Sequence, residues 1–349
     1  MQKMAGTIFG PQNVTTTDNS TVETEVFSGI RIFKICIYFA IPVVGLIGNG
    51  LVIFVTGYKM KTTVNSIWFL NLAIADFIIS LTLIITIILA LCKMAWHFGD
   101  FKCKFLQFMI YLNMFASIFL LTTISLDRCL CTWMVVWTRN NRTLFKARII
   151  CKIVWILSIG CSIPAVLNHT TTQLKGICNY PTSIQSLKSL VTYRFIVGFL
   201  IPFLIIAFSY IAIAVQIKRL KEGKQLRSYR VIIAVVLAFF ICWLPYHIHE
   251  FYDISAEVNQ WSESAKEVLL NTDAVVVCLT FLNSSLNPIL YVFMSDEYKK
   301  KLKQSLLLVL ETAFVEDHLD LKVPKQTKDI TISMRGNCQD DIYNSAFMT

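Results

Sequence analysis

Residues 65–92 read NSIWFLNLAIADFIISLTLIITIILALC, an apolar run in which Asp76 is the single charged side chain. A helix needs roughly 20 residues to cross the hydrocarbon core of a bilayer, and this run is long enough. It does not alternate apolar and polar residues as the strands of a membrane barrel do. Lipid offers the backbone no hydrogen-bonding partner, so the run is predicted to be a helix, which satisfies its own N–H and C=O groups.

The same pattern recurs along the chain. Apolar runs cover residues 31–57, 65–92, 104–132, 148–167, 189–217, 229–251 and 269–294. A chain that is 55% hydrophobic and only 15% charged is also too apolar for a water-soluble domain. The sequence therefore predicts an all-α membrane protein, a seven-transmembrane helix bundle over residues 31–295.

Basic side chains gather in alternate connections, those after the first, third, fifth and seventh spans. They are Lys59, Lys61, Arg139, Arg142, Lys146, Arg148, Lys218, Arg219, Lys221, Lys224, Arg227, Arg230, Lys299, Lys300, Lys301 and Lys303. Basic connections face the cytosol, so the N-terminus is expected outside and the C-terminus inside. Anionic headgroups at the inner leaflet then account for the net charge of +10, and no nucleic-acid partner is expected.

The polar segment 1–30 is expected to be an extracellular, glycosylated tail. Acceptor triplets begin at Asn13 and Asn19 in that tail and at Asn168 after the fourth span. Cys103, at the outer end of the third span, and Cys178, in the following outer loop, both face the oxidising compartment. We expect these two cysteines to form a disulfide.

Several amide, hydroxyl and carboxyl side chains lie inside the predicted spans, where polar groups are costly and mark function. They are Asp76, Asn113, Ser117, Asn283 and Asn287. Oxygen ligands of this kind suit a hard cation, so an allosteric Na⁺ site is expected, and no other cofactor. The alternative is a packing network of satisfied polar groups without an ion.

Four spans contain a proline: Pro164, Pro202, Pro245 and Pro288. Each proline removes a backbone hydrogen bond and is expected to bend its helix. Beside Pro245, Phe239 and Trp243 share one helix face. Bulky rings at a kink form a plausible bistable core.

Together these motifs resemble the rhodopsin-like G-protein-coupled receptors from about Gly48 to Lys303. The matching residues are Gly48-Asn49, Asn71 to Asp76, Asp127-Arg128-Cys129, Trp155, Pro202 with Tyr210, Cys242 to Pro245 and Asn287-Pro288-Ile289-Leu290-Tyr291. The resemblance implies that Asp127 holds Arg128 at rest and that activation releases Arg128 towards a heterotrimeric G protein, beside Tyr210 and Tyr291. It also implies a plasma-membrane location, a short amphipathic helix over residues 296–310 and a cytoplasmic tail, 311–349, whose phosphorylation recruits arrestin.

Within that family, Asn113 to Ser117, Ser125 to Leu130 and Arg194 to Pro202 are similar to the chemoattractant branch, which includes the formyl-peptide receptors, the chemerin receptor and the second prostaglandin D2 receptor. Those relatives carry a proline where this chain has Val135. The branch implies coupling to the inhibitory class of G protein.

An arginine as deep as Arg194 needs an anionic partner. In the resembled branch, a basic residue at this place receives a carboxylate or polar terminus of the ligand, so a peptide or an acidic lipid is expected. An internal pair with Glu250 is the alternative, and both hold if the ligand displaces Glu250. The expected pocket consists of Tyr111, Met114, Arg194, Trp243, His247, Glu250, Asp273 and Phe281.

Other classes of protein fit less well. A light sensor needs a lysine in the last span, which has none between Leu269 and Met294. A transporter would show paired halves, and no such repeat is present. The five histidines form no metal-spaced set, so no enzyme is expected. A non-signalling scavenger of the same fold is the remaining alternative.

Overall fold

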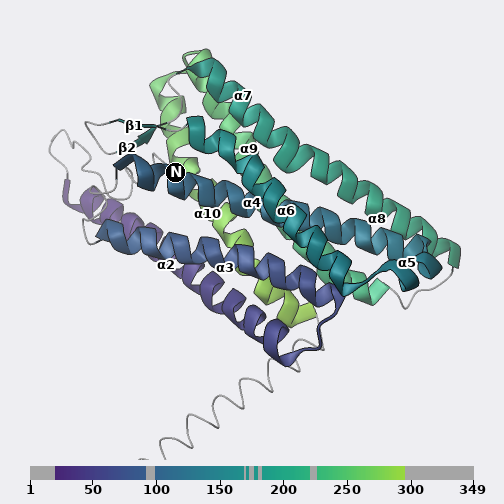
Figure 1. Cartoon of the computed structure of the whole chain (residues 1–349). Helices are drawn as coiled ribbons and strands as arrows, with labels where there is room; N and C mark the ends of the chain where they lie inside the picture. Colours follow the sequence, from purple (N-terminus) through teal and green to yellow (C-terminus); the bar gives the residue numbers. More distant parts are fainter. Residues whose placement is uncertain are drawn as a thin grey trace, which may run out of the picture. The chain divides into compact units, whose positions relative to one another are not determined.

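The computed structural model describes residues 20–91, 99–168, 170–172, 177–179, 183–220 and 226–294, which lie within one unit of the chain. Helices run side by side through this part of the chain as a bundle (Figure 1). The long ones are α2 (Ser20–Phe54), α3 (Val64–Leu91), α4 (Gly99–Trp133), α6 (Leu144–Asn168), α7 (Ile184–Phe195) with α8 (Ile201–Leu220), α9 (Leu226–Val258) and α10 (Glu263–Met294).

The seven predicted spans are confirmed in these residues. Six helical stretches are long and apolar enough to cross a membrane, and α10 contains a shorter apolar stretch, Val275–Leu290. Some helices extend beyond their predicted spans: α2 begins at Ser20, so part of the expected tail 1–30 is helical, and α9 ends at Val258. Hydropathy marks only the part of a helix that lipid surrounds, whereas backbone hydrogen bonding continues into the polar flanks.

Two predicted segments, the amphipathic helix 296–310 and the tail 311–349, lie outside the described residues. So do Asn13 and Asn19. The side chains of Asn168, Cys103 and Cys178 are also outside the described part, so the glycosylation sites and the disulfide stay predictions.

The fifth span is continuous but changes its winding before Pro202. A π-helical turn, η3 (Ile196–Leu200), joins α7 to α8. Proline has no N–H to donate to the preceding turn, and a widened turn is one way for a helix to accommodate it. The other three prolines that were expected to bend spans also lie inside helices: Pro164 in α6, Pro245 in α9 and Pro288 in α10. A second π-helical turn, η1 (Val55–Lys59), extends α2.

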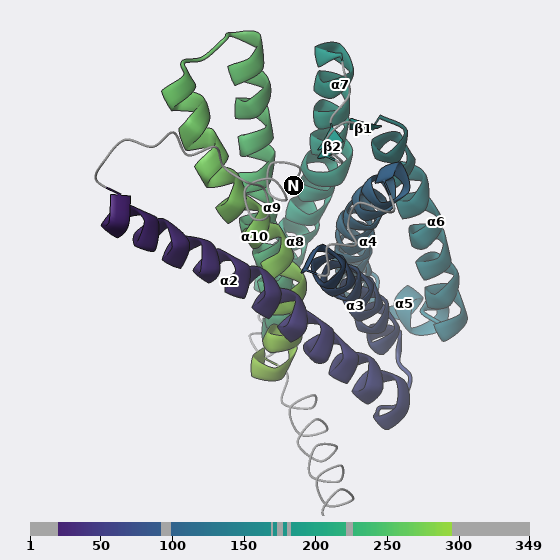
Figure 2. The same ribbon diagram turned by 90° about the vertical axis from the view of Figure 1, so that its left-hand side faces the viewer.

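Helix α4 holds the centre of the bundle, since it contacts α3, α6, α8 and α9 (Figure 2). Its inward side chains, including Met114, Phe115 and Leu120, are almost completely buried. Side chains on the outer faces of neighbouring helices, such as Ile156 and Phe208, are more than 60% exposed. Apolar exposure on this scale is stable only where lipid covers it.

Helices α2 and α10 approach each other closely because α2 carries glycines at the contact. A methyl group on Gly48 would lie 2.9 Å from Cβ of Pro288, and one on Gly45 would lie 2.9 Å from the hydroxyl of Ser285. Small residues at such positions let helix backbones pack tightly in a membrane.

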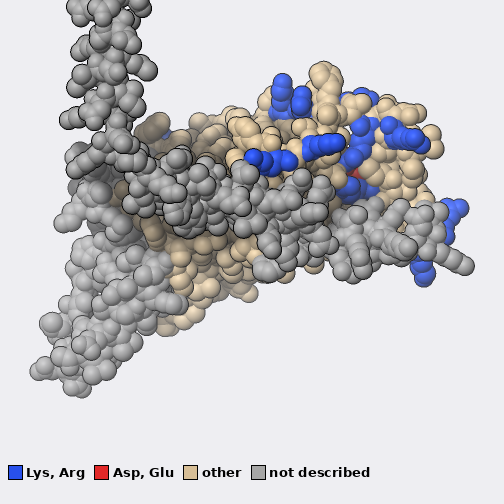
Figure 3. Space-filling model, turned by 90° about the horizontal axis from the view of Figure 1, so that it is seen from below, with Lys and Arg blue, Asp and Glu red and all other residues tan. Residues whose placement is uncertain are grey.

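The two ends of the bundle differ. At one end, a hairpin of β1 (Thr170–Thr172) and β2 (Ile177–Asn179) lies against α4, with Thr171 opposite Cys178. Lys and Arg gather towards the other end, where the short helix α5 (Val135–Asn141) follows α4 (Figure 3). This basic end is the one predicted to face the cytosol.

Candidate functional site

Arg194 is a buried guanidinium in the last turn of α7, with 1% of its surface exposed. It forms an ion pair with the Glu250 carboxylate of α9 and donates a hydrogen bond to the Tyr111 hydroxyl of α4. The side chains of the ion pair are only 2% and 6% exposed. A charge this deep requires a partner, and the internal partner is Glu250.

Two aromatic rings enclose the ion pair. The guanidinium carbon of Arg194 lies 5.1 Å from the ring centres of both Tyr111 and Tyr246. The Tyr246 hydroxyl donates a 2.8 Å hydrogen bond to Glu250. Tyr246 was not predicted, although its place one helical turn before Glu250 is the signal that could have found it. Among the described residues, the contacts of Arg194 thus include a carboxylate, a hydroxyl and two ring faces.

A set of aromatic rings in mutual contact surrounds His247 of α9. His247 is 1% exposed, and its ring centre lies 5.0 Å from that of Phe199 and 5.7 Å from that of Phe195. Neither ring nitrogen of His247 has a hydrogen-bond partner within the described residues. Trp243 stacks on Phe239 at 5.8 Å, so the predicted core beside Pro245 is present as a continuous aromatic contact.

Part of the predicted pocket meets around Arg194. Tyr111 and Glu250 contact Arg194 itself, Trp243 and His247 lie edge-on against Tyr246, and Met114 lies beside Gly198 of η3. Phe281 packs instead with Ile79, Leu83 and Val277, between α3 and α10. Asp273 is partly exposed on α10.

The structure also has a cavity of about 340 Å³ between α6 and α7, lined by Pro164, Gln185, Ser186, Ser189, Leu190 and Tyr193. None of the predicted ligand-binding residues lines this cavity. In the predicted pocket, the Glu250 carboxylate and the Tyr111 hydroxyl engage the guanidinium of Arg194.

In the middle of the bundle, two predicted side chains converge on the predicted carboxylate of Asp76. Asn113 and Asn287 donate hydrogen bonds of 3.1 and 2.6 Å to the two oxygens of Asp76. Ser284 donates a 3.4 Å hydrogen bond to Asn113, and Asn49 donates one of 2.9 Å to the Ser284 carbonyl. This network ties α2, α3, α4 and α10 together.

Buried oxygens remain around this network. Ser117 Oγ, Asn283 Oδ1 and Asn287 Oδ1 are buried and have no hydrogen-bond partner within the described residues. Together with Asp76 they form a donor set of one carboxylate, two amides and a hydroxyl, which fits a hard cation such as Na⁺. No group of three or more His, Cys, Asp or Glu side chains suited to a metal occurs in the described part of the chain.

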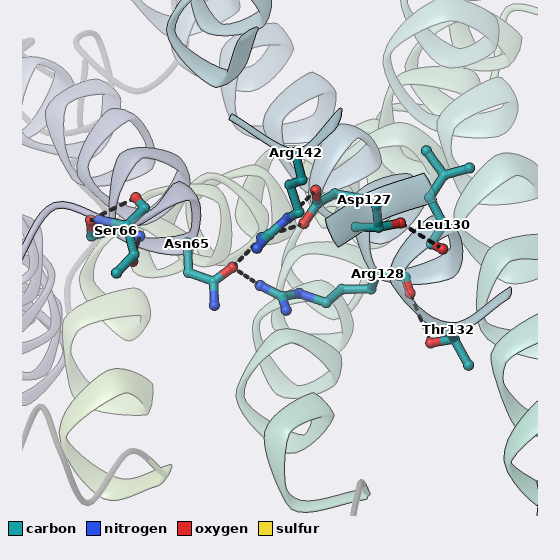
Figure 4. A network of polar contacts seen from close by, with 9 residues as sticks. Asn65, Ser66, Asp127, Arg128, Leu130, Thr132 and Arg142 are labelled. Atoms are coloured by element: carbon teal, nitrogen blue, oxygen red, sulfur yellow. Dashed lines mark hydrogen bonds and ion pairs between the residues drawn. The ribbon is translucent and has the colours of Figure 1, made fainter. Parts of the chain in front are cut away.

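At the basic end, Asp127 accepts two hydrogen bonds from one guanidinium, that of Arg142 in the loop after α5. Arg142 donates through Nε and Nη2 to the two Asp127 oxygens, each at 2.8 Å (Figure 4). Burial by itself lowers the pKa of Arg142, but the hydrogen bonds and the charge of Asp127 outweigh it and raise that pKa above its ordinary value. The sequence predicted Arg128 as the resting partner of Asp127 and did not identify Arg142.

Asn65 of α3 links the two arginines. Its side-chain oxygen accepts a hydrogen bond of 2.5 Å from Arg142 and another from Arg128 (Figure 4). Asn65 was also missed, because an amide near a helix start usually reads as a surface residue. Only the approach of α3 to the end of α4 gives it a role.

Of the other predicted coupling residues, Tyr210 packs against Ile213 and Ile217, as does Cys129, the residue after Arg128. Phe239 and Asn287 are buried, and Pro288 packs against Gly48. The side chain of Tyr291 lies outside the described part.

Comparison with known proteins places the sequence of this chain in one family. A family model described as 7 transmembrane receptor (rhodopsin family) matches residues 48–291. The chain is 36% identical to the C3a anaphylatoxin chemotactic receptor of Danio rerio over 318 residues, covering 90% of this chain and 86% of that receptor.

Two further relatives are similar at the same level. Chemerin-like receptor 1 of Homo sapiens is 36% identical over 321 residues, covering 86% of this chain and 84% of its own length. The fMet-Leu-Phe receptor of Macaca mulatta is 35% identical over 325 residues, covering 86% of this chain and 94% of that receptor.

Proposed function

The chain belongs to the rhodopsin family of 7 transmembrane receptors, within its chemoattractant-type G-protein-coupled members, and we propose that its activating ligand presents a carboxylate that displaces Glu250 from Arg194. As a member of that family it is a multi-pass plasma membrane protein, and its relatives are receptors, not enzymes. The buried Arg194–Glu250 pair is the observation that carries the proposal.

Glu250 occupies the place that an incoming carboxylate would take. An arginine presents a planar fork that matches a carboxylate, so a ligand group of the same chemistry competes for the same donors. Exchange of one carboxylate for another keeps Arg194 paired and avoids a buried unpaired charge. The released Glu250 is then available to a cationic group, which favours the C-terminus of a peptide that also carries positive charge, over an acidic lipid.

Binding at this place can reach the core beside Pro245. Glu250 lies on the same helix as Trp243, and His247 lies between them in the chain and touches Trp243 and Phe199. A change at the α9 carboxylate can therefore shift rings that pack between η3 and α9. We infer that this coupling drives activation of a G protein of the inhibitory class, followed by arrestin recruitment.

The test compares ligands that differ only in the carboxylate. Purified receptor in nanodiscs is exposed to peptides with free C-termini, to their C-terminal amides, and to fatty acids with their alcohols, and nucleotide exchange on inhibitory-class Gα is measured. An active acid should lose about 2 to 5 kcal/mol of binding energy, at least about thirtyfold in potency, on Arg194→Ala.

Comparing an acid with its amide on the same variant separates the loss of the carboxylate contact from misfolding of the receptor. In Arg194→Ala, an acid and its amide should become equally potent, whereas Lys188→Ala, on the same helix, should keep the preference for the acid. An acid that binds Arg194→Ala with undiminished affinity contradicts the carboxylate anchor.

The scavenger alternative gains no support from the relatives, whose names are those of chemotactic, chemerin-like and formyl-peptide receptors. A scavenger would bind its ligand and leave nucleotide exchange unchanged on every Gα subunit.

We also propose that Asp76, Asn113, Ser117, Asn283 and Asn287 hold a Na⁺ ion that stabilises the resting arrangement of the helices. The buried oxygens without partners around Asp76 support this proposal over a satisfied packing network. A ligand that favours a different helix arrangement would then bind more weakly as Na⁺ concentration rises.

A further inference from the structure

We propose that Arg142 competes with Arg128 for Asp127 and thereby sets how tightly the resting receptor holds Arg128. The competition follows from three residues that the chain brings together from separate elements: Asp127 near the end of α4, Arg142 after α5 and Asn65 at the start of α3.

The cluster holds two positive charges and one negative charge. Arg142 places two donors on the two Asp127 oxygens in the bidentate geometry that gives the strongest arginine–carboxylate contact. Its charge therefore balances much of the negative charge that would otherwise attract Arg128, the next residue in the chain. The raised pKa of Arg142 agrees with a close interaction of this kind.

Arg128 has a neutral acceptor in Asn65, whose oxygen it shares with Arg142. A hydrogen bond to an amide holds a guanidinium less firmly than a full carboxylate does. Arg128 must move to meet a G protein, so its release is easier while Arg142 is on Asp127. Arg142 is thus a positioning residue that acts on Arg128 through Asp127.

Arg142 lies at the basic end of the bundle, which is the end predicted to meet the G protein. Arg142 caps the C-terminal end of α5, and its side chain is 24% exposed, against 14% for Asp127. Solvent and salt screen the pair only in part at this exposure. A partner that docks on α5 and pulls Arg142 from Asp127 would therefore tighten the hold of Asp127 on Arg128.

The first test measures basal nucleotide exchange, which needs no ligand. Arg142→Gln should lower the basal rate by about two- to fivefold, the range of a partly exposed ion pair. Arg142→Lys keeps the charge but loses the fork, so its rate should lie between those of the wild type and Arg142→Gln. The matched control is Arg139→Gln, which removes the same charge from the exposed face of α5.

Because that readout rests on the proposed G-protein activation, a second measurement works without any G protein. A double-mutant cycle of Asp127→Asn and Arg128→Gln on melting temperature reports the coupling between Asp127 and Arg128. The coupling should be larger in the Arg142→Gln background than in the wild type, because the carboxylate is then left to Arg128.

The outcomes are distinguishable. If no Gα subunit responds to the receptor, the proposed function fails, and the melting cycle still decides the role of Arg142. Equal coupling in the two backgrounds overturns the competition. So does a basal rate that rises or stays unchanged in Arg142→Gln, or one that falls equally in Arg139→Gln.

Discussion

Replacing Glu250 with leucine would leave the Arg194 guanidinium buried beside an apolar side chain. Breaking a buried ion pair by removing one partner costs about 3 to 5 kcal/mol. The Tyr246 hydroxyl also loses its acceptor, which adds about 1 kcal/mol. The two tyrosine rings face Arg194 in both proteins, so they offset none of this loss. Glu250→Leu is therefore expected to destabilise the receptor by about 4 to 6 kcal/mol.

The matched change removes both charges. Arg194→Met together with Glu250→Leu leaves no charge to desolvate, so the double variant should melt near the wild type or above it. Glu257→Leu, an exposed carboxylate on the same helix, should change little and serves as the control. Melting is followed with a thiol-reactive dye, since Cys151 and Cys242 are free and buried in the folded chain.

A second arm ties this stability test to the proposed ligand chemistry. Acetate or formate should raise the melting temperature of Glu250→Ala, because a small carboxylate can pair with Arg194, and should leave Glu257→Ala unchanged. A Glu250→Leu protein that melts with the wild type, or a double variant as unstable as Glu250→Leu alone, would refute the reasoning.

Three other outcomes are expected. Gly48→Ala should destabilise the bundle by about 1 to 3 kcal/mol by overpacking against the rigid ring of Pro288, whereas Gly160→Ala, with open space around it on α6, should stabilise by about 0.5 to 1 kcal/mol; thermal melting compares the two. Asp76→Asn should abolish any Na⁺ dependence of agonist affinity, measured by competition binding over a Na⁺ titration against K⁺, and a dependence that survives the change contradicts the ion site. Trp155→Phe should cost about 1 kcal/mol, because the indole donates a 3.0 Å hydrogen bond to Asn71 across α6 and α3; a melting temperature equal to that of the wild type would show that this bond contributes nothing.

Hydropathy predicts the helices well, because an unsatisfied backbone group in lipid costs so much that each long apolar run has one stable structure. The runs near residues 65–92 and 104–132 agree with α3 and α4 to within a few residues. Polar side chains within spans are informative for a related reason, since burying them needs partners, and Asp76, Asn113 and Asn287 do meet.

Contacts between helices were harder to predict, because they depend on how the helices rotate and tilt about one another. Phe281 sits in a span at a plausible pocket position, yet it packs with Ile79 and Val277. Asn65 and Arg142 carry no motif, and their roles exist only because α3, α4 and the loop after α5 converge.

The amino-acid sequence by itself determined the membrane topology class, the family and the identity of the buried charges, because the cost of placing polar groups in lipid is visible one residue at a time. Tertiary structure alone decided which partner each charge has: Glu250 for Arg194 and Arg142 for Asp127. Ion pairing depends on distances of a few ångströms between different helices, and those distances are set by the packing of the whole bundle.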